Sequence, residues 1–420
     1  MKRTRWALWL LEPVPLRWTL GGVTALFLIY LFVGLRSAEL NAPWKIDEGQ
    51  RIAEGYAWRL LTNLEPGDRD WFRTAATRSH PPVAKYVFGA SVELAGVEAP
   101  RDLELTEAYE RGAGAATMPV KFATEYQPRL RPARIASFVF NLLTAVTVFG
   151  VLLRLQGLGT AVLSQGLLFR HYLFVHALFY ARSDTIQTFF AVSTVVPLLL
   201  CLHVSRLSRA VPAALLAGTL AALSFQTRLN GGVALIMCLA FLLAGVPIRK
   251  RTALLGATVV AAFVVVSIGV NPYYWATPAL FAELPATLTE PQALPLRIAR
   301  RFEIQVHDLV TLSAGVPVEW HMNSFRERLP FTASVLGSGK AGWITMAGLV
   351  LALGLALSRR GGTTERALVA WAVSGLLVMA FWIPLRWDVY LLIVLPSSIL
   401  VASSGIGLLL RKAADRLRPA

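Results

Sequence analysis

The sequence reads Trp44-Lys45-Ile46-Asp47-Glu48-Gly49 shortly after its first apolar run, which extends from Trp18 to Leu35. Later in the same polar region it reads Ser79-His80-Pro81-Pro82-Val83-Ala84-Lys85. The first stretch contributes two adjacent carboxylates, and the second an imidazole, two prolines and a lysine. We expect both to lie in one loop just outside the membrane, provided that the apolar run spans it.

The composition indicates that the apolar runs of this chain span a membrane. The chain has 420 residues, of which 55% are hydrophobic and 16% charged, and its mean hydropathy is +0.55. A soluble domain of this size cannot bury so much apolar surface, and the apolar runs have the length of bilayer-spanning helices. The sequence therefore predicts an all-α polytopic membrane protein with about ten transmembrane helices, at 18–35, 133–153, 157–176, 184–203, 210–226, 231–247, 253–270, 341–357, 367–384 and 388–409.

The first apolar run has an alternative interpretation as a cleaved signal peptide. It is long for that role, and no small-residue cleavage site lies directly at its end. We expect it to be a transmembrane helix.

The net charge of +16 is distributed unevenly. With the N-terminus inside, the predicted cytoplasmic segments hold 17 Lys and Arg residues and three acidic residues, which leaves only +2 for the rest of the chain. Basic residues held on one side of a membrane set orientation. The excess charge thus indicates topology, with both termini cytoplasmic, and not nucleic-acid binding.

The two cysteines, Cys201 and Cys238, fall inside predicted spans. We expect them to pack as small hydrophobic residues. They indicate no disulfide framework, and no Cys/His spacing typical of a metal site occurs.

Two predicted extracytoplasmic loops, 36–132 and 271–340, are far longer than the others. Long loops on one face place the working surface there, because loops commonly carry function. In the first loop, one helical face would be apolar and the other polar, which predicts an interfacial helix. The apolar face would hold Ile52, Ala53, Tyr56, Ala57, Leu60 and Leu61, and the polar face Gln50, Arg51, Glu54 and Arg59.

Two further interfacial helices are expected. The apolar stretch 83–97 is too short to cross a bilayer comfortably, although a true span there is an alternative that would invert the topology. The charge distribution argues against that inversion. In the second loop, Phe302, Val306, Leu309 and Val310 share one face of an amphipathic helix.

The outer face carries the groups that sugar transfer from a phosphate carrier requires. A carboxylate can accept the proton of the acceptor hydroxyl, and cations can stabilise the departing phosphate. The candidates are the carboxylates Asp47 and Glu48, with the cations Lys85, Arg182, Arg228 and Arg386 at span ends. Ionisable groups at such depths are costly and therefore candidate functional groups.

Structural alternatives exist for these residues. Asp47 could simply cap a helix. Each cation could reach the interface or pair locally, Arg182 with Asp184 and Arg386 with Asp388.

The order of these motifs resembles the GT-C superfamily of lipid-linked-sugar transferases, above all the protein O-mannosyltransferase and aminoarabinose transferase branch. The resemblance covers most of the chain. It rests on Asp47-Glu48, His80-Pro81-Pro82-x-x-Lys85, Arg182-Ser183-Asp184, Thr227-Arg228-Leu229-Asn230-Gly231, Asn271-Pro272, and Arg386-Trp387-Asp388-Val389-Tyr390 followed by Pro396.

The resemblance implies Asp47 as catalytic base with Glu48 as its neighbour. It places His80, Lys85, Arg228 and Arg386 near the carrier phosphate or the acceptor, and adds Arg182 and Tyr390 to the substrate-binding group. Some relatives use a divalent metal ion, for which Asp184 together with Asp47 is the candidate site.

The sequence also departs from the family pattern. Arg228 stands where Lys is frequent, about ten spans are predicted where relatives have more, and we expect no large C-terminal luminal domain. A protein acceptor is therefore not implied.

The sequence predicts a single GT-C-like transmembrane domain over 1–420, in a bacterial inner membrane. It would be an inverting glycosyltransferase that moves a sugar from a polyprenyl-phosphate carrier to a hydroxyl of an acceptor lipid, glycan or protein, without nucleic acid. The alternatives are a transporter or flippase for a lipid-linked or anionic substrate, and an inactive assembly subunit. The absence of paired repeats argues against a transporter.

Overall fold

A computed structural model of the chain describes residues 22–24, 30, 40, 48, 52–66, 68, 71, 78, 80–98, 127–178, 180–246, 249–275, 293–314, 321–322, 324–358, 362–382 and 385–417. This part of the chain is built from helices, with one isolated β-bridge between His321 and Leu385. The elements are η2 (Glu54–Tyr56), α4 (Ala57–Thr62), α6 (Val83–Leu94), α9 (Gln127–Leu155), α10 (Leu158–Leu168), α11 (Tyr172–Ala177), α12 (Ser183–Ser193), α13 (Val195–His203), α14 (Leu207–Phe225), η5 (Leu229–Gly232), α15 (Val233–Gly245), α16 (Arg249–Gly269), α17 (Pro272–Trp275), α18 (Leu294–Ala314), α19 (Phe325–Leu336), α20 (Gly339–Leu357), α21 (Thr363–Trp382), η9 (Asp388–Ile393) and α22 (Leu395–Leu417).

Six described helices are long and apolar enough to cross a membrane: Gln127–Leu155, Ser183–His203, Leu207–Phe225, Lys250–Gly269, Gly339–Leu357 and Thr363–Phe381. Shorter apolar helices occupy Leu158–Leu168 and Leu229–Gly245. The protein is therefore a multi-pass, all-α membrane protein, as the hydropathy predicts. Most of the predicted span 18–35 lies outside the described residues.

The predicted span 157–176 is not one continuous helix. It is divided into α10 and α11, because the chain turns at Phe169 and Arg170 and then restarts at His171. The His171 Nδ1 accepts from the backbone N–H of Leu173 at 3.3 Å and so caps α11.

Small residues bring the long helices together. A Cβ added to Gly218 of α14 would lie 2.3 Å from the carbonyl oxygen of Val259 in α16, and one added to Gly348 of α20 would meet Ala402 of α22 at 2.8 Å. Close backbone approach of this kind is how membrane helices gain packing contacts without help from water. The bundle core also encloses Trp371 completely.

The bundle has a basic end. Arg251, at the start of α16, donates to the carbonyls of Cys201 (3.0 Å) and Ser205 (3.2 Å), where α13 ends. Arg411, near the end of α22, donates to the Gln156 carbonyl, where α9 ends. Cations stabilise helix C-termini, because the last carbonyls have no partner within their own helix.

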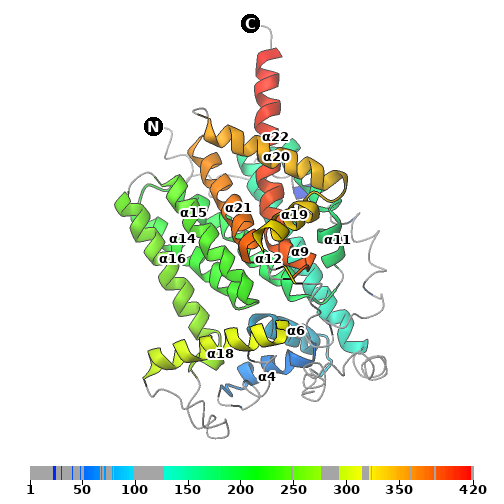
Figure 1. Ribbon diagram of the computed structural model, residues 1–420, viewed down its shortest axis with the longest axis vertical. Helices are drawn as coiled ribbons and strands as arrows, with labels where there is room; N and C mark the ends of the chain where they lie inside the picture. The colour runs from blue at the N-terminus through cyan, green and yellow to red at the C-terminus, as the bar shows by residue number, and fades with distance from the viewer. Residues whose placement is uncertain are drawn as a thin grey trace.

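The opposite end is covered by α4, α6 and α18 (Figure 1), and is called the α18 end below. These helices lie across the ends of the bundle, far from the C-terminal end of α22. A 12-residue helix such as α6 is only about 18 Å long and cannot cross a bilayer.

The predicted helix after residue 50 is present as Ile52 and Ala53 followed by η2 and α4. Five of its six predicted apolar residues, Ile52, Ala53, Tyr56, Ala57 and Leu60, are buried within the protein, and Glu54, predicted on the polar face, is also completely buried. Helix α6 packs on η2 and covers Glu54, whose carboxylate faces Lys85 and His80.

Candidate active site

Glu48 is held in a buried ion pair. Arg134 of α9 donates from Nε to Glu48 Oε1 (2.9 Å) and from Nη2 to Oε2 (2.8 Å). The backbone N–H of Ala181 adds a third bond to Oε1 (2.7 Å), while Arg134 Nη1 reaches the Leu40 carbonyl (3.0 Å). Both oxygens of Glu48 are thus engaged by donors. The preceding residue, Asp47, lies outside the described residues.

Glu54 forms a second carboxylate centre that the sequence does not single out. Its Oε2 lies 3.8 Å from Lys85 Nζ, and its Oε1 lies 3.7 Å from His80 Nδ1. The Lys85 side chain is only 4% exposed and that of Glu54 is fully buried. Opposite charges at this separation in a dehydrated site attract strongly. The two basic residues of the His80-to-Lys85 motif therefore meet at one acid.

A hydrogen bond joins this centre to the loop after α14. The backbone N–H of Val83, the first residue of α6, donates to the Gln226 carbonyl (2.9 Å). The Gln226 side chain in turn accepts from Asn271 Nδ2 (3.1 Å). The bond lies two residues from Lys85 on one side and two from Arg228 on the other, so the two cations belong to one region.

Arg228, Asp184 and Tyr390 converge from three elements. Arg228 Nη1 forms an ion pair with Asp184 Oδ1, and its guanidinium carbon lies 5.0 Å from the centre of the Tyr390 ring, close enough for a cation–π interaction. Gln187 fixes the loop by donating to the Arg228 carbonyl (3.3 Å) and to Asn230 Oδ1 (2.7 Å). The Arg228 side chain keeps 17% of its surface exposed.

The alternative local ion pair between Arg182 and Asp184 does not form, because Asp184 forms its ion pair with Arg228. The Arg182 guanidinium instead lies 5.7 Å from the centre of the Tyr180 ring. Its backbone N–H donates to Ser137 Oγ (3.0 Å) and holds the start of α12 against α9. Within the described part of the chain, no carboxylate pairs with the Arg182 side chain.

The alternative local pairing of Arg386 with Asp388 does not occur either. Asp388 accepts a hydrogen bond from the Tyr172 hydroxyl (3.0 Å), whereas Arg386 is exposed and has no ion-pair partner among the residues described. Arg386 and Arg182 are therefore the two candidate cations without a carboxylate partner in this part of the structure.

Asp184, the candidate metal ligand, is paired with a cation in the structure. Arg228 already neutralises the Asp184 carboxylate, and a neighbouring cation repels a second one. No group of three His, Cys, Asp or Glu side chains comes together in the described ranges. The second predicted ligand, Asp47, falls outside those ranges.

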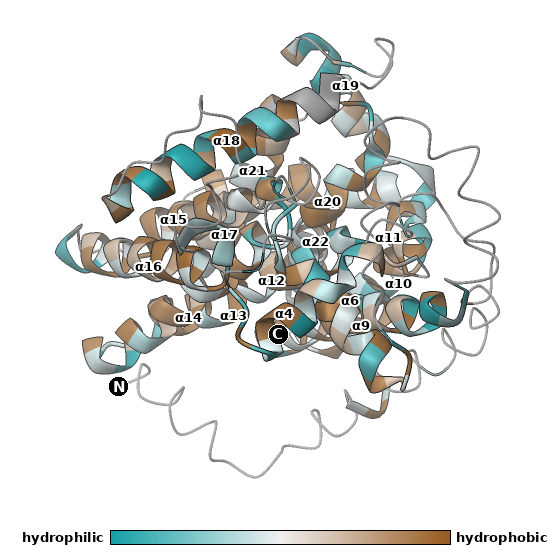
Figure 2. Ribbon diagram, turned by 90° about the horizontal axis from the view of Figure 1, so that it is seen from below, coloured by the Kyte–Doolittle hydropathy of each residue, from teal (hydrophilic) through white to brown (hydrophobic). Residues whose placement is uncertain are grey.

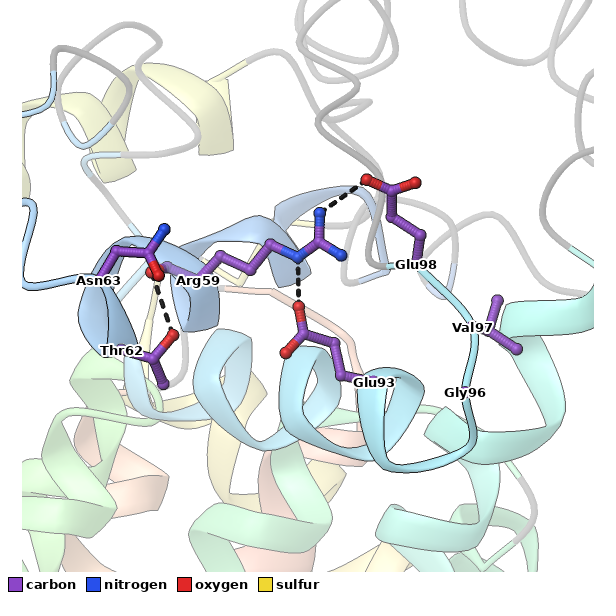
Figure 3. A pocket seen from close by; sticks show the side chains of 7 residues that line it. All are labelled: Arg59, Thr62, Asn63, Glu93, Gly96, Val97 and Glu98. Carbon is purple, nitrogen blue, oxygen red and sulfur yellow. Dashed lines mark hydrogen bonds and ion pairs between the residues drawn. The ribbon is translucent and has the colours of Figure 1, made fainter.

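A separate pocket opens between α4 and the C-terminal end of α6 (Figure 3), with a volume of about 680 Å³. Arg59 bridges Glu93 and Glu98 across it, with 2.7 Å to Glu98 Oε1. The hydrogen bond from Arg59 lowers the pKa of the exposed Glu98 carboxyl group. The pocket contains none of the residues that the sequence motifs identify, so it lies apart from the candidate site.

The structure thus brings His80 and Lys85 together at Glu54, and Asp184, Arg228 and Tyr390 together at the start of α12. Glu48 lies beside Ala181, one residue before Arg182, in a separate pair. Glu54 and Arg134 are the residues that sequence reasoning misses. For Arg134, the available signal is a cation inside the predicted span 133–153, which needs a counter-charge.

The fold is similar to those of two proteins of known structure. ArnT from Cupriavidus metallidurans in its apo state is 15% identical, with a TM-score of 0.54 over 94% of this chain and 61% of that one. The same protein bound to undecaprenyl phosphate gives a TM-score of 0.56 over 93% and 60%. The apo oligosaccharyltransferase of Archaeoglobus fulgidus is 14% identical, with 0.55 over 95% and 52%.

The chain thus spans about 60% of the length of the ArnT chains it matches. No protein-family model and no curated protein sequence matches it. ArnT, an aminoarabinose transferase, and the oligosaccharyltransferase are both GT-C superfamily members. The protein shares its fold with ArnT and with this oligosaccharyltransferase, which confirms the predicted resemblance at the level of the fold.

Proposed function

We propose that the protein is an integral-membrane glycosyltransferase that moves a sugar from a polyprenyl-phosphate carrier to an acceptor hydroxyl. The observation that carries this proposal is the Val83–Gln226 hydrogen bond, which joins the Lys85 and Arg228 segments into one cationic cluster at the α18 end. A phosphate headgroup at the membrane surface is the anion such a cluster suits. ArnT, which shares the fold, has been solved bound to undecaprenyl phosphate.

The reaction is an inverting displacement. The acceptor oxygen attacks the anomeric carbon, and the bond between that carbon and the phosphate oxygen breaks. The phosphate departs with the bonding electrons, and Asp47 takes the acceptor proton. Lys85, Arg228 and Arg386 stabilise the charge that develops on the lipid phosphate.

The remaining residues position these groups. Glu48, whose two oxygens are engaged by Arg134 and Ala181, anchors the segment that follows Asp47 and does not itself accept a proton. His80 and Arg182 contribute to binding of the donor or the acceptor. Tyr390 orients Arg228. No step is assigned to a metal ion, because Arg228 holds Asp184.

The α18 end faces the extracytoplasmic side of a bacterial inner membrane, and the basic end, with both termini, faces the cytoplasm. The whole chain, 1–420, acts as one transmembrane unit. The acceptor is a lipid, glycan or protein hydroxyl.

Asp47→Asn in proteoliposomes fed a radiolabelled polyprenyl-phosphate sugar tests the proposal. We expect covalent transfer of label by the wild-type protein and its loss in Asp47→Asn, with unchanged expression and membrane insertion. Near-normal transfer by the variant would remove Asp47 from the mechanism. Movement of labelled lipid across the bilayer without transfer would instead support the flippase.

A further inference from the structure

Residues at the start of η9 reach the surface of the protein beside Arg228. Trp387, Asp388 and Tyr390 are each partly exposed, and the Tyr390 ring contacts the Arg228 guanidinium. Residues 391–393, which follow in the same element, are buried in the bundle core. The buried half anchors η9, so the exposed half is held in a fixed position.

The element η9 lies near the middle of the bundle. It packs on α12 and leads into α22, and these two helices lie near the middle of the view from the α18 end (Figure 2). The N–H of Trp387 donates to the Leu385 carbonyl (2.8 Å), and Leu385 forms the β-bridge to His321. The backbone of Trp387 is therefore held from both sides, by η9 and by the segment before it.

The Tyr390 ring connects the Trp387 ring to the cation. The centres of the Trp387 and Tyr390 rings lie 5.6 Å apart, with their planes tilted by 33°, and the Arg228 guanidinium carbon lies 5.0 Å from the Tyr390 ring centre. The sugar of a lipid-linked donor is bonded directly to the phosphate. A phosphate held by Arg228 therefore brings its sugar close to Trp387, whose large flat ring can pack against the C–H groups of a sugar.

Asp388 adds a hydrogen-bond acceptor beside the two rings. Its Oδ2 accepts from the Tyr172 hydroxyl (3.0 Å), which fixes the direction of the carboxylate. Within the described ranges, Asp388 Oδ1 accepts no hydrogen bond and no cation forms an ion pair with this carboxylate. A carboxylate oxygen accepts strong hydrogen bonds from hydroxyl groups, and hydroxyl groups surround the edge of a sugar ring. The aromatic face and the carboxylate thus match the two kinds of surface that a sugar offers.

We propose that Trp387 and Asp388 bind the sugar of the lipid-linked donor. Trp387 packs on the C–H face of the sugar that is bonded to the phosphate, and Asp388 accepts a hydrogen bond from one of its hydroxyl groups. The donor is favoured over the acceptor because Tyr390 connects these residues to Arg228, the cation assigned to the donor phosphate. This inference rests on the proposed function, and it adds the residues that distinguish a sugar-bearing lipid from the bare lipid phosphate.

Binding of two kinds of lipid probe to the detergent-solubilised full chain tests the inference. One probe is undecaprenyl phosphate, and the others are undecaprenyl phosphates that carry a single glucose, galactose, mannose or arabinose. For the wild-type protein we expect at least one sugar to lower Kd about tenfold relative to the bare lipid. Trp387→Leu should abolish this gain and leave the Kd of the bare lipid unchanged, which also shows that the variant is folded.

Three further variants sharpen the test. Trp387→Phe keeps a flat ring and should retain part of the gain, whereas Asp388→Ala should reduce it. Trp343→Leu is the matched control, because Trp343 is 73% exposed on α20, away from η9. Its preference for the sugar-bearing lipid should equal that of the wild-type protein.

Equal weakening of both kinds of lipid in Trp387→Leu would show that Trp387 only supports Tyr390 and Arg228, and would overturn the inference. A full gain retained in Trp387→Leu would assign the ring to another ligand, such as the acceptor, and would overturn it as well. If the wild-type protein bound the bare lipid and no sugar lowered Kd, the sugar site would be contradicted while carrier binding stood. Binding of neither kind of lipid would contradict the proposed function itself.

Discussion

Glu48 and Arg134 form a bidentate ion pair, in which neither side chain is more than 1% exposed. Removing one partner of a buried pair leaves an uncompensated charge, which typically costs about 3–5 kcal/mol. We therefore expect Glu48→Ala to lower the melting temperature of the detergent-solubilised protein sharply.

The double variant Glu48→Leu with Arg134→Met should recover much of that stability, because well-packed apolar residues can replace a buried pair. If Glu48→Ala instead unfolded like the wild type, the pair would have no anchoring role. That result would also contradict the positioning role proposed for Glu48.

Stacking of Arg228 on Tyr390 gives a prediction for donor binding. A partly buried cation–π contact is worth roughly 1–2 kcal/mol, so Tyr390→Leu should raise KM for the lipid donor about tenfold. Tyr390→Phe keeps the ring and serves as the matched control, with KM close to that of the wild type. An equal loss in both variants would mean that the Tyr390 hydroxyl acts, and not the ring face.

The buried Glu54 carboxylate should matter more than a surface carboxylate nearby. Glu54→Gln keeps the shape and removes the charge facing Lys85 and His80, so we expect kcat/KM to fall at least roughly tenfold. The Lys85 ammonium then loses the carboxylate that faces it in the buried site.

Glu93→Gln is the control for Glu54. Its ion pair with Arg59 is partly exposed (Figure 3), and such pairs contribute little. Steady-state rates at one pH compare the two variants. Equal values of kcat/KM in both would show that Glu54 has no special relation to Lys85.

Close approach of α6 to η2 depends on Gly89. A Cβ at this position would lie 2.0 Å from the Gly55 carbonyl oxygen and 2.6 Å from Trp58 Cβ. Overpacking costs about 1–3 kcal/mol, so Gly89→Ala should lower both the melting temperature and the transfer rate.

Gly150→Ala provides the opposite expectation. Nothing lies within 4 Å of a Cβ there, and Ala within a helix is favoured over Gly by roughly 0.5–1 kcal/mol. Thermal unfolding should show a neutral or slightly raised melting temperature for Gly150→Ala. A Gly89→Ala protein as stable as this control would contradict the close packing of α6 on η2.

The sequence predicts individual residues of the candidate site, but it does not predict which of them pair. Asp184 and Arg228 stand out singly because charges at span ends are expensive. Their partnership does not, because the neighbouring Arg182 is the simpler partner on the linear chain. The structure pairs Asp184 across two helices instead, since α12 and α14 pack together and present Arg228 to it.

Glu54 shows the other kind of limit. The helical pattern predicts it on the polar face, but α6, which comes from later in the chain, packs on η2 and buries it. For α18 the amphipathic pattern is visible in the sequence, but the pattern does not say which side faces the protein. That side is fixed by Arg78, Tyr273 and Tyr274, which supply partners for its polar groups.

By itself, the sequence determined that this protein is a helical membrane protein, because the length of an apolar run is a property of a local segment. It also determined which polar residues are costly enough to be candidates. Only the tertiary structure decided which acid meets which base, because those pairs join helices that are distant in the chain and become neighbours only when the bundle packs.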